Sequence, residues 1–198
     1  MKRLLLISFI LLSAFINAQG ANKDSVFLSS ISISSGDGVL SQGILFESSF
    51  HKGKDLISLY LGERDLGIAY LKNLWKEKLL AGPVLEYYLN LPTIGFQLIF
   101  SPLDNLTLFS WTGFSAGNPG EKLNLEKWRY LFYYQSLEYS YKNLSCNAII
   151  MEHRGWQPII YFKYTQPLLK NVNLFGSVGY NFFGEGRALL RLGITYKK

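Results

Sequence analysis

The side chains that could carry out hydrolysis are few and lie far apart in the sequence. The chain has two histidines, which stand in His51-Lys52-Gly53 and His153-Arg154-Gly155. Glu152, His153 and Ser115 are the best candidates for a nucleophilic triad, in which the imidazole activates the serine hydroxyl. Adjacent loop residues seldom orient one another in this way, so an exposed polar loop explains Glu152 and His153 without catalysis.

Other signatures of catalysis or cofactor binding are missing from the sequence. The chain contains no His-Glu-x-x-His zinc motif, no Cys-x-x-Cys pair and no glycine-rich phosphate loop. Its one cysteine, Cys146, allows neither a disulfide within the chain nor a thiolate metal site. We therefore predict no cofactor and no metal.

The first residues have the pattern of a secretory signal peptide. Lys2 and Arg3 precede an apolar run from Leu4 to Ile16, and Ala18 offers a cleavage point. We predict that residues 1–18 are removed and that residues 19–198 form one domain. Removal of Lys2 and Arg3 lowers the formal net charge from +6 to +4. This excess is too small to indicate nucleic-acid binding, although it suits anionic lipid headgroups.

The composition favours a membrane barrel. Hydrophobic residues make up 48% of the chain and aromatic residues 16%, yet no apolar run after residue 20 is long enough for a transmembrane helix. An exported chain that is apolar but lacks such helices is typical of a membrane β-barrel.

Hydrophobic alternation along the chain predicts the strands of this barrel. Between Arg187 and Tyr196 the even positions are apolar or aromatic, and most odd positions are polar or small. This period of two over about ten residues suits a tilted strand that crosses a bilayer. Similar segments recur along the chain and predict a closed antiparallel up-and-down barrel of about twelve strands, with eight or ten as alternatives. For residues 70–80 the spacing of apolar residues also allows a helix, but Gly82-Pro83 favours a hairpin there.

The lengths of the connections give the predicted barrel an orientation. The two longest predicted loops, 115–127 and 152–157, are the seventh and ninth connections and therefore lie at the same end. Long loops outside and short turns inside are the rule for outer-membrane barrels, which places His51 in a periplasmic turn. Aromatic residues are predicted to ring both ends of the barrel. Those expected at the inner rim are Trp75, Tyr141 and Tyr196. The three expected at the outer rim are Trp111, Trp128 and Trp156.

In these patterns the chain resembles small Gram-negative outer-membrane β-barrel proteins, although no specific family motif supports the resemblance. Outer-membrane lipid, lipopolysaccharide and the barrel-assembly machinery are the partners that the resemblance implies. The residues expected to contact lipopolysaccharide phosphates are Lys122, Lys127, Arg129 and Arg154. Some members are lipid A deacylases with a His-x-Ser pair, which this sequence lacks.

The polar faces of the predicted strands carry charges of both signs. If the apolar faces contact lipid, these charges lie in the lumen, where pairing offsets the cost of their burial. The sequence thus predicts an ion-paired network that leaves little or no open channel. Its members are Glu47, Glu86, Glu138, Lys163, Arg187 and Arg191.

Three functions follow from this interpretation. The first is a non-enzymatic outer-membrane barrel with a structural, adhesion-type or narrow-pore role. The second is an enzyme that modifies lipid A or phospholipid at an atypical site. The third is a secreted soluble barrel that binds an apolar ligand, as lipocalins do.

Overall fold

Twelve antiparallel strands form the part of the chain that the structure describes. The structure, a computed structural model, describes residues 26–62, 65–88, 91–116, 128–152, 156–182 and 187–198, except for 37–43, and the predicted signal peptide lies outside these ranges. The strands are β1 (Val26–Gly36), β2 (Ile44–Lys52), β3 (Asp55–Leu61), β4 (Asp65–Trp75), β5 (Leu79–Tyr88), β6 (Leu91–Leu103), β7 (Leu106–Ala116), β8 (Trp128–Tyr141), β9 (Leu144–Glu152), β10 (Trp156–Leu169), β11 (Val172–Asn181) and β12 (Arg187–Lys197).

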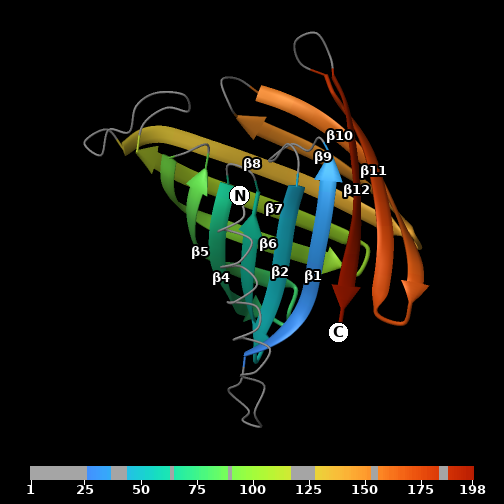
Figure 1. Ribbon diagram of the computed structural model, residues 1–198. Coiled ribbons are helices and arrows are strands. Elements are labelled where there is room, and N and C mark those ends of the chain that lie inside the picture. The colour runs from blue at the N-terminus through green and yellow to red at the C-terminus, as the bar shows by residue number, and fades with distance from the viewer. Residues whose placement is uncertain are drawn as a thin grey trace.

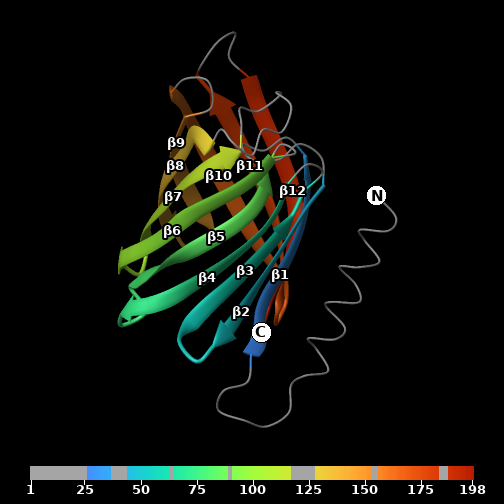
Figure 2. The same ribbon diagram turned by 90° about the vertical axis from the view of Figure 1, so that its left-hand side faces the viewer.

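The strands close into a single barrel. Each strand pairs with its neighbours in the sequence, and β1 pairs with β12 along Ser30 to Gly36. Figure 1 shows β1 and β12 side by side near the C-terminus, and Figure 2 shows the common tilt of the strands around the barrel. The prediction of a closed, up-and-down barrel of twelve strands is confirmed, as is the hairpin between β4 and β5.

One end of the barrel carries only short turns among the described connections. These turns are 53–54, 76–78, 104–105, 142–143 and 170–171. Several of them contain backbone with positive φ, at Gly53, Lys76, Glu77 and Lys142, as tight hairpin turns require. The connections between β7 and β8 and between β9 and β10 both belong to the opposite end, as the parity of the strands predicts.

Strands extend further into the predicted loops than side-chain polarity indicates. Ser115 is paired with Thr93 inside β7, and Trp156 pairs with Glu152 at the start of β10, so both predicted loop boundaries were wrong. His51 is likewise a strand residue opposite Leu56 and not part of a turn. Backbone pairing does not depend on side-chain polarity, which explains all three corrections.

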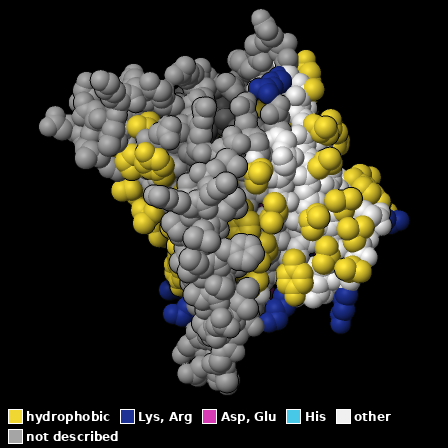
Figure 3. Space-filling model, in the orientation of Figure 1, with side chains coloured by type: hydrophobic (Ala, Val, Ile, Leu, Met, Phe, Trp, Pro, Cys, Tyr) yellow, Lys and Arg dark blue, Asp and Glu magenta, His cyan; other side chains and the backbone are white. Residues whose placement is uncertain are grey.

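The outward face of the barrel is apolar. Large hydrophobic side chains such as Phe96, Phe162 and Leu190 are more than half exposed there. Figure 3 shows hydrophobic side chains spread over one face, with Lys and Arg at its edges. No helix among the described residues is long and apolar enough to cross a membrane.

Aromatic residues mark the short-turn rim as predicted, but the outer rim only in part. Trp75, Tyr141 and Tyr196 are exposed at strand ends beside the short turns. Trp111 was wrongly placed at the outer rim, since it lies in the middle of β7 with 5% of its surface exposed. Trp128 and Trp156 begin β8 and β10, but their side chains lie outside the described part of the structure.

Pro83 stands inside β5 at a gap in the hydrogen-bond ladder. Val84 pairs with Ala69 and Ala81 with Lys72, but the positions between them are not paired with β4. Proline has no N–H to donate, and this accounts for the gap. The Tyr70 carbonyl oxygen occupies the space that a Cβ at Gly82 would need. Position 82 therefore needs a residue without a Cβ, directly before the proline.

Candidate functional site in the barrel lumen

The strand registers determine which side chains face the interior. Glu47 is paired with Tyr60, Tyr60 with Gly67, and Gly67 with Glu86, so these four positions share one face of the sheet. Continuing around the closed barrel by register brings this same face to Arg191 in β12. Arg191 is buried while its strand neighbours Leu190 and Leu192 are exposed, which identifies this face as the inward one.

All six charged residues predicted for the lumen lie at inward positions. The acidic residues are on β2, β5 and β8, and the basic residues are on β10 and β12. The lumen therefore has an acidic side and a basic side. The acids are Glu47, Glu86 and Glu138, and the bases are Lys163, Arg187 and Arg191. Pairing within the full set of six stays a prediction.

Arg191 joins the two strands that close the barrel. Its Nη1 donates a hydrogen bond of 2.8 Å to Ser34 Oγ, and its Nη2 donates one of 3.3 Å to the Gly36 carbonyl oxygen, both on β1. The Arg191 side chain is 9% exposed. Charge-assisted hydrogen bonds of this kind are stronger than neutral ones, so Arg191 stabilises the β1–β12 seam.

Lys163 and Arg191 lie at the same level of the basic side. Both are paired with Ser177, one from each neighbouring strand. Lys163 Nζ lies 4.5 Å from the centre of the Phe175 ring, a cation–π contact. Glu47 is on β2, which only β1 separates from β12, so this acidic residue is the one nearest in strand order to Arg191.

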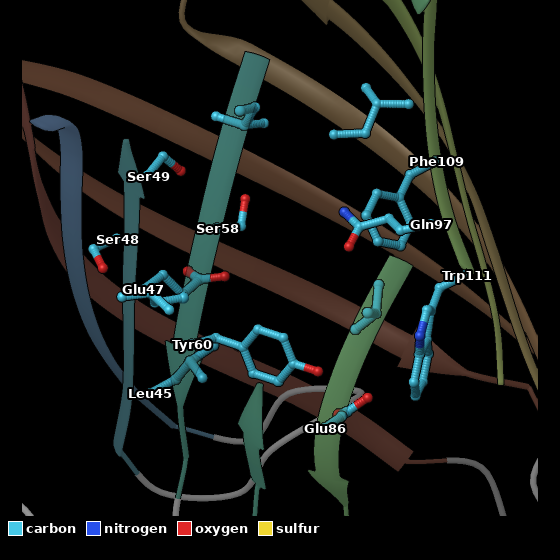
Figure 4. Close-up of a pocket in the computed structure, with 14 residues that line it drawn as sticks. Leu45, Glu47, Ser48, Ser49, Ser58, Tyr60, Glu86, Gln97, Phe109 and Trp111 are labelled. Atoms are coloured by element: carbon cyan, nitrogen blue, oxygen red, sulfur yellow. The ribbon is translucent and has the colours of Figure 1, made fainter. Parts of the chain in front are cut away.

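A cavity of about 310 Å³ lies on the acidic side of the lumen. Glu47, Glu86, Gln97 and Tyr60 contribute its polar atoms, together with serines of β2 and β3. Figure 4 shows Glu47, Tyr60 and Glu86 around this space, with Trp111 and Phe109 on its far side. No lysine or arginine is among the described residues that line it.

A glycine on β4 makes room for one wall of this cavity. The Tyr60 ring lies across Gly67, since a Cβ at that position would overlap the end of the ring. Gly67 is paired with Glu86 on its other side. The tyrosine therefore extends over β4 toward the glutamate, as Figure 4 shows. Tyr161 lies across Gly179 in the same way on the basic side.

The rest of the interior contains an apolar cluster. Val84, Trp111, Tyr134, Ile149 and Leu189 belong to it, with Ile99, Phe109 and Tyr161 among the side chains that pack against it. Phe109 and Tyr134 meet edge to face, with ring centres 5.5 Å apart. These side chains fill inward positions that in a wide porin would be open to water. The lumen is therefore narrowed by packed side chains.

The candidate catalytic residues are not brought together in the described part of the structure. Ser115 is buried on β7 at an inward position, whereas Glu152 ends β9, two strands away. The Glu152 side chain and His153 lie outside the described residues. Among the residues that are described, no group of three or more His, Cys, Asp or Glu side chains forms a metal site.

The predicted lipopolysaccharide contacts lie at or beyond the long-loop end. Lys122, Lys127 and Arg154 are outside the described residues. Arg129 is the second residue of β8, and its side chain is not described. Contact of these four residues with lipid phosphates stays a prediction.

Sequence reasoning identified the inward charges but missed the cavity. Phe109 and Trp111 lie in a segment that is apolar on both faces, so alternation does not predict its orientation. No role was predicted for Tyr60 or Gln97 either. A signal was nonetheless present, since inward glycines such as Gly67 and Gly95 recur beside strands that carry large aromatic residues.

Comparison with known proteins supports the fold only. No family model matches the sequence, and no curated protein matches it. The solved structure of the KdgM porin in complex with disordered oligogalacturonate is similar, with a TM-score of 0.54 and 10% identity, covering 86% of this chain and 99% of that one. The NanC porin is similar with a TM-score of 0.53 and 9% identity, covering 86% of this chain and 100% of that one.

Proposed function

We propose that the protein is an integral outer-membrane barrel whose narrow, charged lumen acts as a small pore. The observation that carries this proposal is the closed twelve-strand barrel with charges of both signs at inward positions. The exposed apolar outer face and the aromatic residues at the short-turn rim support a membrane location. The similar fold of two porins, KdgM and NanC, supports a role in permeation.

Side chains in the lumen limit the width of the proposed pore. Glu47 attracts Lys163 and Arg191, and the packed cluster around Trp111 takes up further space. A charge without a partner in such an interior would be costly. The lumen therefore stays narrow, and only small solutes or ions can pass.

Conductance in planar bilayers tests this function. We expect the unmodified protein to show small current steps, because packed inward side chains occupy part of the lumen. Lys163→Ala should raise the conductance about threefold or more, since it removes bulk and a cation that attracts Glu47. Lys170→Ala is the matched control, because Lys170 is exposed in the turn between β10 and β11. A large, steady conductance of the unmodified protein would exclude a narrow lumen and favour a wide porin.

The orientation in the membrane is tested by labelling introduced cysteines with an impermeant maleimide on intact cells. Cys146→Ser provides the background, because Cys146 is a half-buried free cysteine. A cysteine at Lys122 should react, since its connection belongs to the predicted outer end. A cysteine at Lys54 should react only after the cells are opened, because the turn 53–54 belongs to the other end. The reverse pattern would contradict the proposed topology.

A further inference from the structure

The cavity beside Glu86 has the chemistry of a binding site for a small organic cation. Its described lining combines the carboxylates of Glu47 and Glu86 with the rings of Tyr60, Phe109 and Trp111. No basic side chain is present among these lining residues. Among these described residues an anionic solute would meet two carboxylates and no cation, which disfavours its binding.

The two carboxylates differ in their surroundings. Lys163 and Arg191 act electrostatically on Glu47. Glu86 is on β5, which lies across the closed ring of strands from β11 and hence from the basic side. The Glu86 side chain is only 9% exposed. A cation bound in the cavity would interact with both carboxylates, and such charge interactions strengthen away from bulk water.

Gln97 adds an uncharged polar group to the same cavity. Its side chain is 8% exposed and lines the cavity, and Figure 4 shows its amide directed into that space. Within the described part of the chain, the Gln97 amide makes no hydrogen bond. Its amide oxygen can accept a hydrogen bond from a donor group of a ligand in this space.

The aromatic rings determine what else the ligand carries. Trp111 is 5% exposed and forms part of the apolar cluster, so the inner wall offers ring surface and aliphatic carbon. Ring faces attract cations, and tryptophan does so most strongly. A bare metal ion prefers several oxygen ligands around it, whereas much of this lining is ring surface and aliphatic carbon. We propose that the cavity binds a small primary ammonium attached to an apolar or aromatic body.

Calorimetry on the full-length barrel folded in detergent tests this proposal with three probes of one shape. Benzylammonium should bind, whereas benzyl alcohol and benzoate should bind at least about tenfold more weakly, a difference of about 1.4 kcal/mol. Glu86→Gln keeps the size of the side chain and removes its charge, so it should weaken benzylammonium about tenfold. Glu138→Gln is the matched control, because it removes an inward carboxylate that is not among the cavity residues.

Gly67→Ala tests the same site without changing its charge. A Cβ at position 67 would push the Tyr60 ring off β4, so the ring should enter the cavity and weaken benzylammonium binding. Heat-modifiable migration on a gel shows whether each variant is folded. Equal binding of benzyl alcohol, or full binding by folded Glu86→Gln, would overturn the proposal. Calorimetry measures binding whether or not the barrel conducts ions. Absence of binding would therefore contradict the cation site without contradicting the proposed pore function.

Discussion

Replacing Arg191 with alanine should lower the free energy of unfolding of the barrel by about 3 kcal/mol. The change removes two hydrogen bonds to β1, to Ser34 Oγ and to the Gly36 carbonyl oxygen. It also removes a cation that attracts Glu47. Urea unfolding in detergent, followed by tryptophan fluorescence, measures the loss directly.

Two further variants separate the role of this side chain from its charge. Arg187→Ala is the control, because Arg187 lies on the same strand at an inward position but is exposed. Arg187→Ala should lower the free energy of unfolding by less than about 1 kcal/mol. The stability of Arg191→Lys should lie between those of Arg191→Ala and Arg187→Ala. Lysine keeps the charge but cannot donate to both Ser34 and Gly36 as the forked guanidinium does. If Arg191→Ala is no less stable than Arg187→Ala, the arginine does not secure the β1–β12 seam.

Replacing Gly82 with alanine should destabilise the barrel by about 3 kcal/mol. The new methyl group would fall against the carbonyl oxygen of Tyr70 and 3.1 Å from its carbonyl carbon. Both atoms belong to the backbone of β4, so no side-chain rotation relieves the clash. The strands must separate beside Pro83, where the ladder already lacks hydrogen bonds.

Gly176→Ala is the matched control for this prediction. A Cβ there would meet only the end of the Leu192 side chain, at 3.1 Å, and leucine can adjust. The temperature at which the folded band disappears on a gel should fall clearly for Gly82→Ala and little for Gly176→Ala. Equal shifts would show that strand spacing at Gly82 is not limiting.

The two substitutions affect different parts of the ring of strands. Arg191 acts where the first and last strands meet, and Gly82 acts within a local hairpin. The first contact forms only on closure of the ring. The second is required as soon as β4 and β5 pair.

The sequence by itself determined the fold class and the facing of most strands. Alternation along 187–196 separates Leu190 and Leu192, which are exposed, from Arg191, which is buried. This separation is local, because successive side chains of a strand point to opposite faces. Counting strands then assigned each connection to an end of the barrel, and the described short turns agree.

Only the tertiary structure decided which residues of different strands meet. Arg191 and Ser34 are 157 residues apart in the sequence, and nothing local in either strand specifies that they are partners. Their contact follows from the register in which β12 closes on β1. Trp111 is a second case, because a segment that is apolar on both faces has no alternation to orient it. Tyr60 is a third, since its ring passes over Gly67 toward a strand that is not its direct neighbour. Strand alternation is a property of successive residues, whereas register and closure are properties of the whole ring of strands, and the cavity beside Glu86 depends on them.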